Sequence, residues 1–130
     1  MAPARRALAA VFLAASDGTS LCAKRRFDAL ELVSDCYGES HRFADAAEIL
    51  VRAVALAQRP GASWPQREND LARAHLALAS ARSHCEVDDK TKTQAWAAAA
   101  DACAAAGDDA TADAAAKRAQ SHEPERTATD

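Results

Sequence analysis

The chain has 130 residues and a formal net charge of only −3, which suits one globular domain and argues against a chain kept unfolded by its own charge. Alanine supplies 37 residues, whereas Leu, Ile, Val and Phe together supply 19. Alanine is the strongest helix former, and four glycines and four prolines are too few for the turns of a β-sandwich or barrel. The composition therefore predicts an all-α protein. The 16 basic and 19 acidic residues include no extended basic cluster, so no direct contact with nucleic acid is expected.

The first helix is expected over residues 4–16. Arg5 and Arg6 precede nine apolar residues, and two interpretations of this segment stay open. One is an amphipathic helix, and the other is a short signal peptide cleaved near Ser16, which would direct the protein to secretion. The helix is preferred, because three large apolar residues besides Val11 make a weak signal sequence. Its apolar face would carry Leu8, Phe12 and Ala15.

Apolar residues at helical spacing predict the next two helices at 21–38 and 42–58. Gly38 is expected to end the first of them, because glycine commonly follows the last helical residue. The segment 59–65 contains two prolines and a glycine and is expected to be the one substantial linker. The expected core positions are Phe27, Leu30, Val33, Tyr37, Phe43, Ala46, Ala47, Leu50, Ala53, Val54 and Ala57.

Three more helices are expected at 66–84, 89–106 and 109–121, followed by a polar tail at 122–130. Asp88 and Asp89 open one helix, and Asp108 and Asp109 open the next. Negative charge at a helix start complements the helix dipole, and an aspartate side chain can cap the free backbone N–H groups there. Gly107 is expected to end the helix between the two acidic pairs. These carboxylates are therefore interpreted as caps and not as an acid–base pair.

The cysteines form no metal or redox pattern. They stand at Cys22, Cys36, Cys85 and Cys103, without the close pairs that zinc sites and redox-active motifs require. No metal ion and no other cofactor is expected, and four unpatterned thiols suit a reducing, cytoplasmic compartment. No apolar run approaches the length of a transmembrane helix. Known catalytic motifs are also missing, so an enzyme is not expected.

Two stretches share the spacing of a known helical repeat. The first contains Leu30, Val33, Ser34, Tyr37, Ala46 and Leu50. The second contains Trp96, Ala99, Ala100, Cys103, Gly107, Ala112, Ala116 and Pro124. Both resemble the tetratricopeptide repeat (TPR), in which small residues let two antiparallel helices approach and larger residues fill the gaps between layers. The resemblance implies antiparallel helical hairpins stacked as a short α-solenoid. A six-helix bundle is the alternative.

The two matches conflict in register, because only one helix separates the hairpins and a solenoid alternates its two kinds of helix. Taking 59–65 as the junction gives a first repeat at 21–58 and a second at 66–106. Helix 109–121 then caps the stack, and helix 4–16 leads it. The resulting period of slightly over 40 residues is similar to the extended TPRs of multidomain bacterial regulators and kinesin light chains.

The resemblance implies a non-catalytic module that binds another protein in a concave groove. In the chosen register the groove would be lined by Asp28, Glu31, Leu32, Asp35, Asn69, Ala72, Arg73 and Leu76. Three acids beside leucines favour a basic, partly apolar peptide or helix as the partner. A stand-alone TPR segment of a transcriptional or signalling regulator is the second possibility, and an enzyme of unrecognised type is a distant third. The sequence carries no signal for an oligomeric state.

Overall fold

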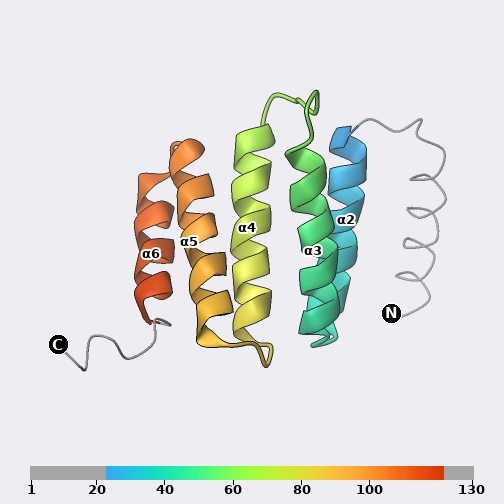
Figure 1. Cartoon of the computed structure of the whole chain (residues 1–130). Coiled ribbons are helices and arrows are strands. Elements are labelled where there is room, and N and C mark those ends of the chain that lie inside the picture. Colours follow the sequence, from blue (N-terminus) through green and yellow to red (C-terminus); the bar gives the residue numbers. More distant parts are fainter. Residues whose placement is uncertain (1–22, 122–130) are drawn as a thin grey trace. The chain divides into compact units, whose positions relative to one another are not determined.

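The computed structural model describes residues 23–121 and contains five α-helices there (Figure 1). They are α2 (Ala23–Glu39), α3 (Phe43–Ala57), α4 (Arg67–Ser83), α5 (Asp89–Ala105) and α6 (Asp109–Ser121). Within this part of the chain there is no strand, and the predicted all-α class is confirmed, with helix ends close to the expected ones. The expected helix 4–16, Cys22 and the tail 122–130 lie outside the described residues.

The chain divides into two compact units, with the boundary between Arg67 and Glu68. The first unit contains α2, α3 and the segment that follows α3. The second contains α4 from Glu68 onward, α5 and α6. Within the units, α2 packs against α3 and α5 packs against α6.

In the first unit, large side chains of α2 are buried together with small and large ones of α3. Phe27 and Leu30 of α2 are buried, and so are Ala46, Leu50 and Ala53 of α3. Alanine at a helix crossing lets the two backbones approach, while phenylalanine and leucine fill the space between them at the density of a protein interior. Alanines thus allow close pairing of α2 and α3, and a few large side chains fill the core between them.

The turn between α2 and α3 has histidine, and not glycine, at its left-handed position. The backbone N–H of Arg42 donates to the carbonyl of Tyr37, and that of His41 donates to Gly38. This pair of bonds is the Schellman motif, whose left-handed position here is His41, with φ of 60°. The expectation that Gly38 ends the helix is wrong, because Gly38 lies inside α2 and the helix continues to Glu39.

The turn between α5 and α6 repeats this geometry with glycine in the left-handed position. Asp108 N–H donates to the carbonyl of Cys103, and Gly107 N–H donates to Ala104. Gly107 has φ of 86°, which glycine adopts without the steric cost of a Cβ atom. Here the predicted helix end at Gly107 is confirmed.

The segment between α3 and α4 is held against α2 by an aromatic contact. The ring of Trp64 lies 5.6 Å from that of Phe27, at an interplanar angle of 50°. The guanidinium of Arg67 donates to the carbonyl of Ala62 at 2.8 Å, and Arg67 N–H donates to the carbonyl of Trp64. These contacts tie the proline- and glycine-containing linker to α2 and to Arg67, the first residue of α4.

The second unit has a core that is almost entirely alanine around one tryptophan. The buried cluster comprises Ala79, Ala95, Trp96, Ala99, Ala115 and Ala119, drawn from α4, α5 and α6. Trp96 is 6 % exposed, and the guanidinium of Arg118 in α6 lies over its ring, 4.9 Å from the centroid. Since alanine buries little apolar surface, Trp96 supplies an outsized share of the buried area here.

Candidate interaction surface on α2

Five exposed residues of α2 form one stripe along the helix. They are Arg25, Asp28, Leu32, Asp35 and Glu39, and we call them the α2 stripe. Their spacing alternates between three and four residues, which keeps side chains on one face of a helix. The buried residues of α2 occupy other positions. The face opposite the core is thus a regular line of side chains with one apolar member.

The apolar member, Leu32, is unusual in its exposure. It is 48 % exposed, and Val51 of α3 at 42 % is the other large apolar side chain exposed among residues 23–121. A leucine held at a helix surface between two carboxylates gains little stabilisation from its own fold, because only removal of apolar surface from water is favourable. Leu32 is therefore the side chain of α2 best placed to be covered by another molecule.

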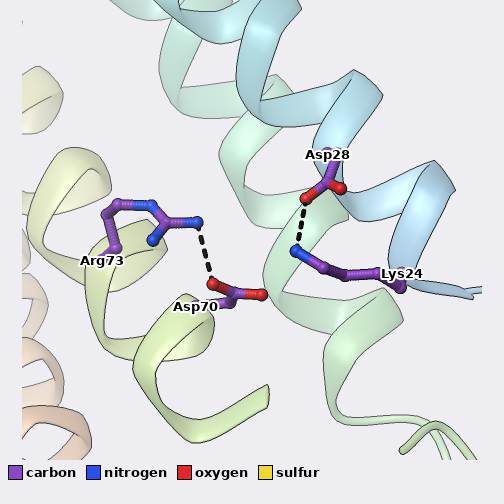
Figure 2. A network of polar contacts seen from close by, with 4 residues as sticks. All are labelled: Lys24, Asp28, Asp70 and Arg73. Atoms are coloured by element: carbon purple, nitrogen blue, oxygen red, sulfur yellow. Dashed lines mark hydrogen bonds and ion pairs between the residues drawn. The ribbon is translucent and has the colours of Figure 1, made fainter. Parts of the chain in front are cut away.

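Asp28 has a partner within its own helix. The ammonium of Lys24 lies 2.9 Å from its carboxylate, one helical turn away, and both side chains are substantially exposed (Figure 2). An ion pair in this setting contributes only a few tenths of a kcal/mol. A basic group on another molecule can therefore replace Lys24 at Asp28 at little cost.

The sequence-predicted set and the observed stripe overlap without coinciding. Asp28, Leu32 and Asp35 belong to both, whereas Glu31 is partly buried beside the stripe. Sequence reasoning missed Arg25 and Glu39 as members. The signal was available, because both residues continue the three- and four-residue spacing, but Arg25 is a base and Glu39 lies beyond the helix end expected at residue 38.

The predicted groove residues of α4 are less exposed as a group than the α2 stripe, and some of them contribute to the fold. Asn69 is exposed, whereas Ala72 is buried. Arg73 donates to the carboxylate of the buried Asp70 at 2.9 Å (Figure 2), so part of its role is to compensate a charge removed from water. Leu76 is partly buried against the alanine–tryptophan core of the second unit. Asp70 itself was not singled out in the sequence, because burial of an aspartate on an alanine-rich helix has no local signature.

Burial shifts the pKa of two side chains in the described part of the chain. Burial lowers the pKa of the half-buried His75, which keeps its imidazole neutral at pH 7. Burial, and secondarily the charge of Asp108, raises the pKa of the Cys103 thiol, so the nucleophilic thiolate is disfavoured there. Cys85, two residues beyond the end of α4, donates from its thiol to the carbonyl of Ala81 in that helix. Among residues 23–121, no three His, Cys, Asp or Glu side chains gather as metal ligands.

The first aspartate of each acidic pair is a helix cap, and the second lies in the first turn of the helix. One oxygen of Asp88 accepts from the backbone N–H of Thr91 at 2.8 Å. One oxygen of Asp108 accepts from the N–H of Thr111, and the other accepts from the Thr111 hydroxyl at 2.7 Å. These hydrogen bonds hold the pKa of both carboxyls below the usual value.

No helix within residues 23–121 is both long and apolar enough to cross a membrane. Comparison with protein-family models, with curated proteins and with solved structures finds no match to this chain.

Proposed function

We propose that the protein is a non-catalytic, TPR-like interaction module that binds a basic, partly apolar segment of another protein along the α2 stripe. The observation that carries this proposal is the exposed Leu32, which stands one helical turn from Asp28 on one side and Asp35 on the other.

The two kinds of side chain would contribute in different ways. The carboxylates create a local negative potential that speeds encounter with a basic partner and is screened by salt. Leu32 offers apolar surface whose removal from water slows dissociation. A surface that combines both selects for partners in which bases flank an apolar residue.

The repeat character of the proposal is supported by the two helical hairpins. The α2–α3 and α5–α6 turns share the Schellman geometry, with His41 and Gly107 in equivalent places. Counting back from those residues by the same interval reaches Leu30 in α2 and Trp96 in α5, which are both buried. These shared features match α2–α3 with α5–α6, the pairing of the two repeat matches in the sequence, whereas the register with its junction at 59–65 pairs α4 with α5.

The proposal is tested by affinity capture with the full chain as bait. A variant carrying Asp28→Asn, Glu31→Gln and Asp35→Asn removes the negative charge with little change in shape. A matched control carries Glu48→Gln, Asp101→Asn and Asp113→Asn, three exposed acids of other helices. We expect a salt-sensitive partner that the wild type and the control capture and the α2 variant loses, with helix content unchanged by circular dichroism. Capture of the same proteins by all three baits would contradict the proposal.

Leu32→Ala provides a second readout once a partner is identified. Because apolar burial acts after encounter, this variant is expected to speed dissociation and to change association little. Slower association with unchanged dissociation would show that burial of Leu32 does not hold the partner in the complex.

A further inference from the structure

The α2 stripe has the spacing of a helix–helix seam. Arg25, Asp28, Leu32, Asp35 and Glu39 follow one another at intervals of three, four, three and four residues, which is the alternation of the facing positions in a coiled coil. From the first to the last, the stripe runs about 21 Å along the helix axis at 1.5 Å per residue.

This spacing favours one backbone conformation in the partner. Successive seam positions of a helix lie about 4.5 to 6 Å apart along its axis, whereas same-side residues of an extended chain lie about 6.8 Å apart. A second helix therefore stays in register with all five positions, and an extended segment loses register within a few residues. Knobs-into-holes packing also surrounds a central apolar residue such as Leu32 on all sides.

The charges along the stripe are ordered. From one end to the other they read base at Arg25, acid at Asp28, apolar at Leu32, and acid at Asp35 and Glu39. Like charges placed opposite each other across two helices are destabilising, and opposite charges are stabilising. Building on the proposed function, we infer that the partner binds as an amphipathic α-helix whose facing residues read acid, base, apolar, base, base along the same direction.

A second copy of this chain fits the stripe poorly. If two α2 helices paired in parallel, each carboxylate would face its own counterpart. If they paired antiparallel about Leu32, Arg25 would face Glu39, but Asp28 would face Asp35. Either arrangement brings acids together at the centre of the seam, beside the leucine that should be covered. The charge pattern thus selects a different helix over self-association.

The inference is tested with fluorescent peptides and the full chain by fluorescence anisotropy. The matching peptide places Glu, Lys, Leu, Lys and Lys at the seam positions of an alanine-rich helix. A proline peptide has one central background alanine replaced by proline, which breaks the helix but leaves the seam residues. A permuted peptide exchanges the Glu with the neighbouring Lys, so that like charges meet in either orientation. We expect about tenfold weaker binding for each altered peptide, near 1.4 kcal/mol.

A charge exchange on the protein side supplies the decisive comparison. The full-chain variant Arg25→Asp with Asp28→Arg presents the stripe that the permuted peptide matches, and its preference should invert. Equal binding of the proline peptide would overturn the helical partner but leave the proposed binding of basic, apolar segments intact. Failure of the preference to invert would overturn the charge order, and failure of every peptide to bind would overturn the inference altogether.

The chain itself contains a segment that meets part of this pattern, one base and one apolar residue. Arg5 and Leu8 of the expected helix 4–16 have the same three-residue separation as Leu32 and Asp35. A full-chain variant with Arg5→Glu and Leu8→Lys distinguishes this occupant. If the matching peptide binds only to that variant, the stripe is covered by the chain's own segment, and the inference of a separate partner helix is wrong.

Discussion

The indole N–H of Trp96 donates a hydrogen bond to the hydroxyl oxygen of Ser83 at 2.8 Å, and that hydroxyl in turn donates to the carbonyl of Ala79 at 3.0 Å. The contact joins α5 to the last residue of α4, at the edge of the alanine-rich core. Ser83 thereby satisfies the hydrogen-bond donor of a largely buried side chain. Because the guanidinium of Arg118 in α6 lies over its ring, Trp96 contacts both of the other helices of the second unit.

Loss of this contact should be measurable as lost stability. Ser83→Ala leaves the buried indole N–H without its acceptor and should cost roughly 1–3 kcal/mol of unfolding free energy.

Trp96→Ala removes the largest side chain of an alanine core and should cost roughly 3–5 kcal/mol. Urea unfolding followed by circular dichroism measures both. A cost below about 1 kcal/mol for Trp96→Ala would show that the tryptophan does not hold the unit together.

Three substitutions at the two helix-ending turns should act with predictable signs. Gly38→Ala places a methyl group where no atom lies within 4 Å, inside a helix, and should stabilise by about 0.5–1 kcal/mol. His41→Gly removes the steric cost of a Cβ atom in the left-handed conformation and should also stabilise. The gain is reduced by the loss of the edge contact between the rings of His41 and Phe43. Gly107→Ala forces a Cβ atom into the same conformation and should destabilise by about 1 kcal/mol.

Thermal unfolding of the three variants checks these signs. The informative comparison is between alanine at position 38 and alanine at position 107, since both replace a glycine near the end of a helix. If both changes shift the melting temperature in the same direction, the assignment of Gly38 to the helix interior is wrong.

The sequence predicted those parts of the fold whose signals lie within a few neighbouring residues. Helix positions depend on alanine content, apolar spacing and capping aspartates, and each of these acts within a few residues. The end of α2 was misassigned because the Schellman motif requires a left-handed residue after the helix, and His41 takes that place although glycine stands three residues earlier. The general preference of glycine for the left-handed position does not show which residue will occupy it in a given turn.

The long-range contacts could not be read in the same way. The segment 59–65 looked like a loose junction from its prolines and glycine, yet Trp64 within it contacts Phe27, far away in the sequence. Likewise, the bond from Trp96 to Ser83 depends on how two helices meet. For the α2 stripe, the acids and Leu32 were found because they share one helix face, whereas the burial of Glu31 beside them depends on tertiary packing.

Trp64 should control the order of the segment that contains it. Trp64→Ala removes the ring contact with Phe27 and should release the bonds that Ala62 and Arg67 make around it. Hydrogen exchange at the amides of Ala62 and Arg67 is expected to quicken by about tenfold or more, whereas the centre of α5 should exchange as before. Trp64→Phe, which keeps an aromatic ring, serves as the matched control. Unchanged exchange in Trp64→Ala would show that the segment is ordered by its own turn bonds.

Acid should weaken the second unit through its two caps. Because hydrogen bonds from Thr91 and Thr111 lower the pKa of Asp88 and Asp108 in the folded protein, folding favours the ionised carboxyls. Their stabilisation is therefore complete above the unfolded pKa and is lost as the pH falls from about 4 through the lower folded values. Asparagine caps a helix nearly as well and does not titrate, so a variant with Asp88→Asn and Asp108→Asn should lose less stability between pH 6 and pH 3. A control with Asp101→Asn and Asp113→Asn keeps both caps and should follow the wild type. Equal acid sensitivity of the cap variant and the wild type, measured by urea unfolding at each pH, would place the acid-labile interaction elsewhere.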